Sequence, residues 1–189
     1  DNPLTLNPPN RKNIAILFRA DCIVCADSSW MSQLQRIGLK NLYYDYLAYN
    51  PILFNTSEEI IQNKRNNKLL FVGRTYGDAW GYKRMLFLNQ FINYDIDIYG
   101  TGAHWDKWLV DFPEIEKKMV YKSSPKIPFE TLKQLLQTYA IYPVDVNPGI
   151  VNGLHLRVFE CLASGILPVT EYTEDISTVF RDIELPVIK

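Results

Sequence analysis

Residues 142–171 read YPVDVNPGIVNGLHLRVFECLASGILPVTE, and this stretch decides the fold of the chain. It predicts a buried strand, a loop rich in turn residues, a helix ended by Gly165 and a second buried strand. A strand, a helix and a strand in succession favour a βαβ unit, whose two strands lie parallel in one sheet. Apolar runs alternate with helical patterns elsewhere too, so the sequence predicts an α/β fold with a mainly parallel sheet flanked by helices.

The helix in this stretch carries positive charge where positive charge is usually unfavourable. Asn152 is expected to cap it, and Gly153 would let a ligand approach the backbone closely. His155 and Arg157 occupy its first turn, although the unpaired N–H groups and the macrodipole already make that end positive. This pattern indicates a bound anion, typically phosphate. Glu160 shares a polar stripe with Arg157, and the two could alternatively pair with each other on an ordinary helix surface.

Composition narrows the class of protein. The chain has 189 residues, 47% of them hydrophobic, which is enough for a substantial core. Its formal net charge of −1 gives no electrostatic footprint for nucleic acid or an anionic membrane, so neither is expected as a partner. No transmembrane segment is expected, because no apolar run is long enough for a bilayer, and the opening residues do not have the pattern of a signal peptide. The opening residues lack a start Met, and we interpret the sequence as a fragment of a longer protein.

Two short motifs are interpreted as structural. The chain has three cysteines, too few for a disulfide framework, and they suit the reducing cytoplasm. Cys22 and Cys25 form a C-x-x-C on a predicted strand, where residues three apart point to opposite faces, so both are expected to be buried structural residues.

Asp95 and Asp97 form a D-x-D, which would need the carboxyl end of a strand to hold a divalent ion against a diphosphate. They begin a predicted strand instead, and no metal site is expected.

The predicted elements bring polar loops together at one edge of the sheet, because ligands of open parallel sheets bind outside the carboxyl ends of the strands. The loops there are unusually rich in Gly, Arg, Ser and Asn, as a phosphate-bearing ligand would require. The predicted strands cover residues 22–26, 69–74, 95–99, 119–122, 141–146 and 166–170. Beside the helix described above, the predicted helices cover residues 11–19, 28–37, 82–91, 104–110, 129–138 and 174–180. Residues 55–68 are expected to hold a short polar helix and an Asn- and Lys-rich stretch, residues 62–68, which is interpreted as a linker or surface connection.

A series of motifs in the second part of the chain resembles a known enzyme family. These motifs are LFVGR at 70–74, DIYGTG at 97–102, DVNP at 145–148, NGLHLRVFECLASG at 152–165 and PVTE at 168–171. They resemble the C-terminal, nucleotide-sugar-binding domain of GT-B glycosyltransferases, in particular the spore-maturation, or CgeB-like, branch of group 1. The resemblance implies a Rossmann-like domain over residues 66–189. It also implies that residues 1–65 are the end of a preceding α/β acceptor-binding domain with its hinge.

The resemblance implies that the chain binds a nucleotide-diphosphate sugar, of the UDP type, without a cofactor or metal. Glu160 would match the glutamate that hydrogen-bonds the ribose hydroxyls. Asn152, Gly153 and the start of the following helix would cradle the diphosphate. His155 would line the site, and Arg157 would add positive charge. Asn152 stands eight positions before Glu160, where many retaining members carry a second glutamate.

The remaining candidates follow the earlier strands. Arg74, together with Lys83 or Arg84, would supply a cationic clamp for the diphosphate. A Gly-x-Gly loop and a pair of serines close the next two strands, and the serines lie where the family binds the nucleotide base. The complete set of candidates is Arg74, Lys83, Arg84, Gly100, Gly102, Ser123, Ser124, Asn152, Gly153, His155, Arg157 and Glu160.

The leading hypothesis is a metal-independent, hexosyltransferase-like glycosyltransferase. It would transfer the sugar of a nucleotide-diphosphate donor to an acceptor that is a glycan, a protein or a small molecule. The family's catalytic base comes from the N-terminal domain, so no catalytic residue is assigned here, and the fragment alone is expected to be inactive. The alternative is a non-catalytic nucleotide-binding or interaction domain of the same fold. A dinucleotide-dependent oxidoreductase is disfavoured, because the loop at Gly100 and Gly102 lacks both a third glycine and the acidic residue about twenty positions later.

Overall fold

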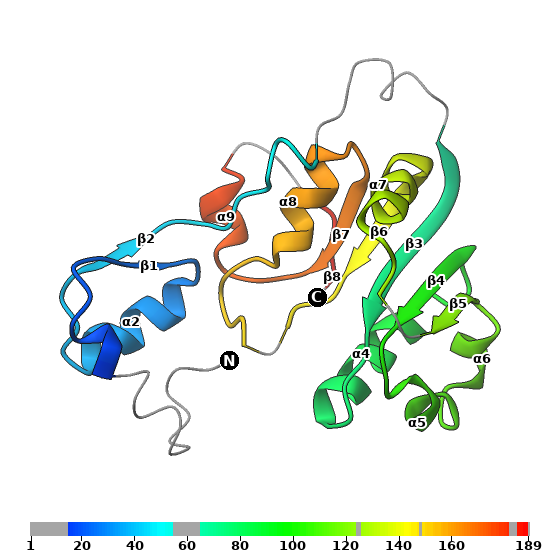
Figure 1. Cartoon of the computed structure of the whole chain (residues 1–189), viewed down its shortest axis with the longest axis horizontal. Helices are drawn as coiled ribbons and strands as arrows, with labels where there is room; N and C mark the ends of the chain where they lie inside the picture. The colour runs from blue at the N-terminus through cyan, green and yellow to red at the C-terminus, as the bar shows by residue number, and fades with distance from the viewer. Residues whose placement is uncertain (1–14, 55–64, 124–125, 148, 182–184, 189) are drawn as a thin grey trace. The chain divides into compact units, whose positions relative to one another are not determined.

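The computed structural model describes residues 15–54, 65–123, 126–147, 149–181 and 185–188 (Figure 1). The chain forms two compact units that interleave along the sequence. The first unit comprises residues 1–47, 146–155 and 172–184, and the second comprises residues 48–145, 156–171 and 185–189. The domain boundary predicted between residues 65 and 66 stays a prediction, because these units are defined by spatial contacts alone.

The second unit is built on a six-stranded sheet with the order β5-β4-β3-β6-β7-β8. Its strands are β3 (Asn66–Arg74), β4 (Ile96–Thr101), β5 (Met119–Ser123), β6 (Tyr139–Val144), β7 (Leu167–Glu171) and β8 (Val187–Ile188). All neighbouring strands are parallel. The predicted α/β class, a mainly parallel sheet flanked by helices, is thereby confirmed.

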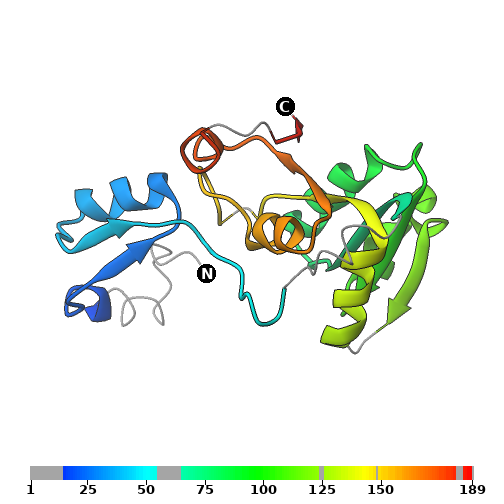
Figure 2. The same cartoon turned by 90° about the horizontal axis from the view of Figure 1, so that it is seen from above.

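Within the described residues of the second unit, five helices flank this sheet. They are α4 (Ala79–Asn89), α5 (Trp105–Leu109), α6 (Pro113–Glu116), α7 (Phe129–Thr138) and α8 (Leu156–Ala163). The first three contact one another, whereas α7 packs on β3 and β6, and α4 and α7 lie on opposite faces of the sheet (Figure 2). Helix α7 has the predicted bounds, and α4 begins three residues earlier than predicted because Asp78 caps it, accepting from the N–H of Trp80 at 3.1 Å. The short elements α6 and β8 were not predicted.

The core of the second unit lies between the sheet and its helices. Both faces of the central strands are covered, which explains their continuous apolar runs in the sequence. The residues with no exposed surface include Leu70, Met85, Leu88, Ile98, Ile115, Leu136, Val158 and Cys161.

A side chain completes the junction between the two central strands, β3 and β6. Pro143 lies in the middle of β6 and has no N–H for the ladder, and the register between the strands is irregular. The hydroxyl of the adjacent Tyr142, which is 2% exposed, accepts from the N–H of Val72 at 3.0 Å and donates to its carbonyl at 2.7 Å. The phenol therefore satisfies both backbone groups of Val72, which lies beyond Leu69, the last residue of β3 in register with β6.

Arg65 joins the ends of two helices. Its guanidinium donates to the carbonyl oxygens of Leu136 at 2.7 Å, Tyr139 at 2.8 Å and Ser164 at 2.6 Å. These carbonyls belong to the C-terminal ends of α7 and α8, where helices leave acceptors unpaired and the macrodipole is negative. The sequence interpretation made Arg65 part of a linker over residues 62–68. Residues 62–64 of this linker, and the short polar helix predicted before it, lie outside the described residues.

The first unit contains β1 (Ile23–Cys25), α2 (Ser28–Arg36), β2 (Leu42–Tyr44) and α9 (Ile176–Val179). β1 and β2 pair in parallel, and α2 ends before Gly38, whose φ of 96° lies in the left-handed region. Residues 11–14 of the first predicted helix lie outside the described residues. All three cysteines are unpaired. Cys25 is buried as predicted, but Cys22 is exposed because it precedes β1, which corrects its assignment to the core.

Candidate functional site

The carboxyl ends of the strands lie at one edge of the sheet, because the strands are parallel. This edge brings together five of the predicted site residues. Arg74 ends β3, Gly100 lies in β4 and Gly102 directly follows it, while Lys83 and Arg84 lie on α4, the helix after β3.

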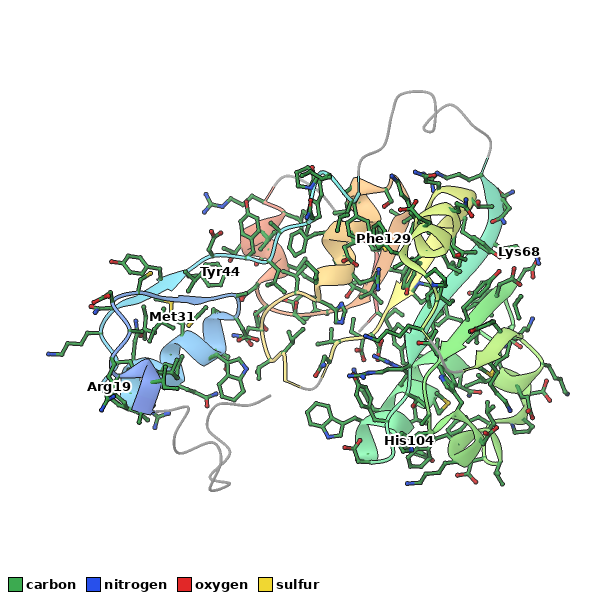
Figure 3. All side chains as sticks on the ribbon, in the orientation of Figure 1. Arg19, Met31, Tyr44, Lys68, His104 and Phe129 are labelled. Carbon is green, nitrogen blue, oxygen red and sulfur yellow. The ribbon has the colours of Figure 1, made fainter. Side chains whose placement is uncertain are left out.

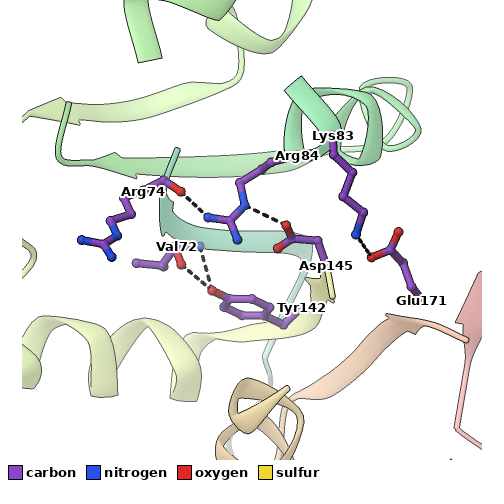
Figure 4. Close-up of polar contacts among 7 residues, drawn as sticks. All are labelled: Val72, Arg74, Lys83, Arg84, Tyr142, Asp145 and Glu171. Atoms are coloured by element: carbon purple, nitrogen blue, oxygen red, sulfur yellow. Dashed lines mark hydrogen bonds and ion pairs between the residues drawn. The ribbon is translucent and has the colours of Figure 1, made fainter. Parts of the chain in front are cut away.

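Arg84 is a buried cation whose partners belong to the chain itself (Figure 4). Its Nε donates to the carboxylate of Asp145 at 2.8 Å, and its Nη1 donates to the carbonyl oxygen of Arg74. The side chains of Arg84 and Asp145 are only 10% and 8% exposed. The guanidinium also lies over the rings of Phe71 and Tyr76, at 5.6 and 5.5 Å. Because breaking a buried ion pair costs about 3–5 kcal/mol, Arg84 fixes the end of β3 to the end of β6.

The neighbouring Lys83 is more accessible. Its Nζ donates to the carboxylate of Glu171, the last residue of β7, and the two side chains are 37% and 26% exposed (Figure 4). Ion pairs with this exposure contribute about 0–1 kcal/mol and open readily. The structure thus separates two adjacent cations that sequence reasoning treated as equivalent. Arg84 is held in a buried ion pair, whereas Lys83 is accessible to solvent at the carboxyl edge of the sheet.

Arg74 is exposed, and the loop after it is held in place by α5. The guanidinium of Arg74 lies 5.4 Å from the centre of the Tyr76 ring. The indole N–H of Trp108 donates to the carbonyl oxygen of Tyr76 at 2.6 Å, and Lys107 donates to that of Gly77. These two hydrogen bonds therefore hold the backbone that follows Arg74 in place.

The two glycines of the next loop have different structural roles. A Cβ on Gly100 would lie 2.3 Å from the Cε atom of Met119, which is the end of a flexible side chain, and 2.9 Å from the Cε2 atom of the Trp105 ring, so the close packing of this ring disfavours a larger residue there. Gly102 has a φ of 76°, which favours glycine. His104, which was not among the predicted site residues, has a φ of 78°, and its ring would lie 3.3 Å from a Cβ on Gly77. A left-handed residue other than glycine is uncommon and marks a constrained loop.

The serine pair is only partly described. Ser123 is the last residue of β5, so its backbone lies at the same edge of the sheet. Ser124 lies outside the described residues. Their predicted contact with the nucleotide base stays a prediction.

Helix α8 presents Arg157 and Glu160 as a close pair. Arg157 Nη1 lies 2.6 Å from the carboxylate of Glu160, and the side chains are 21% and 14% exposed. Burial raises the pKa of Glu160, although the charge of Arg157 acts in the opposite direction. For Arg157, burial lowers the pKa, but Tyr142 and Glu160 raise it overall. The i,i+3 pairing that the sequence left open is therefore present, and it orients both side chains.

The predicted cap of α8 is wrong. The helix begins at Leu156, which puts the cap position at residue 155, so Asn152 lies three residues too early to cap it. The side-chain amide of Asn152 instead donates to Ser28 Oγ at 3.1 Å in the first unit. His155, which is partly buried, immediately precedes the helix. Arg157 lies in the first turn, as predicted.

The loop before α8 binds an anion of its own chain. The N–H groups of Val151, Asn152 and Gly153 donate to Asp27 Oδ2 at 2.7, 3.1 and 3.0 Å. Asp27 Oδ1 accepts two more N–H groups, at 2.9 and 3.2 Å, from the first turn of α2. The carboxylate of Asp27 thus occupies the N–H groups of this loop, and sequence reasoning missed it. An Asp directly before a predicted helix was the available signal. A diphosphate at this loop stays a prediction.

The D-x-D aspartates lie at the opposite end of the sheet. Asp97 accepts from the hydroxyl of Tyr139 at 2.6 Å and pairs with Lys68 at 3.4 Å, near the start of β4. Lys68 and His104 are labelled near the two ends of the sheet in Figure 3. Among the residues that the structure describes, no group of three or more His, Cys, Asp or Glu could hold a metal ion. No helix within the described ranges is long and apolar enough to cross a membrane.

Comparison with known proteins identifies the family. Residues 76–189 match the family described as "Glycosyl transferase-like". This match covers more than half of the chain, and the chain therefore belongs to this glycosyl transferase-like family. Among curated proteins, none matches the sequence.

Solved structures share the fold at low sequence identity. HepE from Anabaena, in complex with UDP and glucose, has a TM-score of 0.62 and 12% identity, over 99% of this chain and 55% of that one. The structure described as "Trehalose-6-phosphate from E. coli bound with UDP-2-fluoro glucose" has a TM-score of 0.57 and 9% identity, over 96% and 53%.

A third neighbour is the apo form of the lipopolysaccharide outer core galactosyltransferase WaaB. Its TM-score is 0.51 at 15% identity, over 82% of this chain and 44% of that one. The chain thus spans about half the length of these proteins. The likeness confirms the predicted Rossmann-like fold, which these GT-B proteins share.

Proposed function

We propose that this chain is the donor-binding part of a two-domain GT-B glycosyltransferase of the CgeB-like branch. It takes a hexosyl group from a nucleotide-diphosphate sugar of the UDP type and passes it to a glycan, protein or small-molecule acceptor. One observation carries the proposal. In a chain of the glycosyl transferase-like family, the accessible cations Arg74 and Lys83 lie on neighbouring elements at the carboxyl edge of a parallel sheet. Ligands of such sheets bind there.

The chemistry needs positive charge at this edge. When the sugar leaves, negative charge develops on the diphosphate, and fixed cations stabilise it without reorganisation. Arg74 and Lys83 would bind the diphosphate, while Arg84 would keep the strand ends in place from its buried pair. Charge from these side chains would serve in place of a metal ion. Glu160, oriented by Arg157, would accept the ribose hydroxyls.

Two further points belong to the proposal. The chain spans about half the length of HepE, so the acceptor site and catalytic base would come from the other half of the whole enzyme. The isolated chain would then bind nucleotide without transferring sugar. We place the enzyme in the cytoplasm, because three unpaired cysteines suit a reducing compartment.

Calorimetric titration of the chain with UDP and with uridine tests this function. Arg74→Ala and Lys83→Ala should each weaken the binding of UDP at least about tenfold, which is the scale of one charge-assisted hydrogen bond. The affinity for uridine should not change. Glu160→Gln should weaken UDP and uridine alike, because both carry the ribose. Lys117→Ala is the matched control, since this lysine also pairs with a glutamate, Glu114 of α6, and both side chains are exposed.

Three results would contradict the proposal. If the wild-type chain does not bind UDP, the donor site is wrong. If Arg74→Ala and Lys83→Ala weaken the binding of uridine as much as the binding of UDP, these side chains stabilise the structure and do not bind the diphosphate. If EDTA abolishes UDP binding, the metal-independent assignment fails.

A further inference from the structure

Two consecutive basic residues of α4 hold two carboxylates in different ways (Figure 4). Arg84 and Asp145 form a buried pair, with 10% and 8% of their side chains exposed. Lys83 and Glu171 form a pair with 37% and 26% exposed. Opening the first pair would leave a buried charge uncompensated, which is strongly unfavourable. Opening the second costs little, because water and other ions can replace either partner.

The backbone on both sides of the accessible pair is fixed. Glu171 is the last residue of β7 and is in register with Ile188 of β8. Lys83 is held on α4, which the neighbouring Arg84 attaches to the ends of β3 and β6. Only the two side chains must therefore move for the pair to open. The carboxylate of Glu171 is therefore a negative charge that neutralises Lys83, a cation of the candidate donor site, and that can move away from it.

We propose that Glu171 is the resident counter-ion of Lys83 and that it competes with the diphosphate of the donor for this lysine. This inference rests on the proposed function. In the empty site, the carboxylate neutralises Lys83 and keeps its side chain at the edge of the sheet. A diphosphate carries more negative charge and displaces it. When the nucleoside diphosphate leaves, Glu171 returns to Lys83, so this residue sets the affinity for donor and product and favours product release.

The test is the substitution Glu171→Gln, which keeps the shape of the side chain and removes its charge. UDP should bind about two- to fivefold more tightly, the scale of one accessible ion pair, while uridine binding should not change. The gain should shrink at high salt, because salt screens exposed charges. Glu114→Gln is the matched control: it removes one carboxylate from the accessible Lys117 and should leave UDP affinity unchanged.

A double-mutant cycle identifies the partner. In a Lys83→Met background, Glu171→Gln should lose at least half of its effect, because the competition needs the lysine. Thermal melts check the folding of each variant, and Glu171→Ser gives a second uncharged residue for the same measurement.

The outcomes distinguish this inference from the function on which it rests. No UDP binding by the wild-type chain would refute the proposed function itself. If the wild type binds UDP but Glu171→Gln binds it equally or more weakly, Glu171 is not a competitor and only the present inference fails. A gain of the same size without Lys83 would also overturn it, because Glu171 would then repel the ligand independently of that lysine.

Discussion

Tyr142→Phe should destabilise the chain far more than the loss of one hydroxyl usually does. The hydroxyl serves both the N–H and the carbonyl of Val72, at 3.0 and 2.7 Å, between the two central strands. Pro143 provides no N–H that could replace it. Because the ring of Tyr142 is fully enclosed, water does not reach the two backbone groups once the oxygen is removed.

The magnitude follows from these two groups. A buried donor or acceptor left without a partner costs about 1–3 kcal/mol, so the two groups together should cost about 2–6 kcal/mol in free energy of unfolding. Proteins are typically stable by about 5–15 kcal/mol, so this is a large share. The melting temperature should fall by about 2–4 °C for each kcal/mol at this chain length.

Urea unfolding followed by circular dichroism measures the effect. The midpoint should fall while the slope with urea stays unchanged, because the same surface is exposed on unfolding. Tyr94→Phe is the matched control, since Tyr94 is 60% exposed, and it should change stability by less than about 0.5 kcal/mol. A Tyr142→Phe variant as stable as the control would refute the role given to this hydroxyl.

Two further predictions concern the carboxylate of Asp27 and the ionisation of Tyr142 and Tyr44. Asp27→Asn should speed hydrogen exchange of the backbone amides of residues 151–153 about tenfold or more, because these amides lose a charged acceptor. Asp21→Asn is the control, since Asp21 is exposed, and it should leave the exchange of these amides unchanged. Unchanged protection in Asp27→Asn would contradict the assignment. Burial raises the pKa of Tyr142 to about 12, and burial with the charge of Asp175 does the same for Tyr44. An unfolded tyrosine ionises near pH 10, so their stabilising contribution is complete below about pH 10 and is lost as pH rises towards about 12. Urea midpoints across this range and ultraviolet titration check it, and ionisation of all tyrosines near pH 10 would argue against it.

Much of the fold follows from local sequence patterns. The bounds of α7 are those predicted, and α2 ends at the glycine that the sequence indicated. Periodicity is a local property, so it locates helices and buried strands well. Periodicity predicted the start of an element poorly in two cases. Strand β3 begins earlier than predicted, at the polar residue Asn66, which still pairs with β6. Helix α4 begins earlier than predicted because the cap at Asp78 was overlooked.

The candidate site was predicted as a set of residues, but its pairings between distant segments were not; only the i,i+3 pair of Arg157 and Glu160 was raised by the sequence. The sequence gives Lys83 and Arg84 the same chemistry, and it places Asn152 at a plausible cap position. In the structure, Asn152 contacts Ser28, 124 positions away, and its own N–H donates to Asp27. Such partners are set by long-range packing, which no local window of sequence contains.

The sequence by itself determined the parallel α/β sheet, its family and the edge at which charged residues gather, because these depend on hydrophobic period and motif order. Only the tertiary structure decided which cation is fixed and which is accessible. Arg84 meets Asp145 across 61 residues, and Lys83 meets Glu171 across 88. Adjacent side chains on a helix point in different directions, so one enters the low-dielectric interior and the other stays near water. The energetic role of each charge follows from that burial.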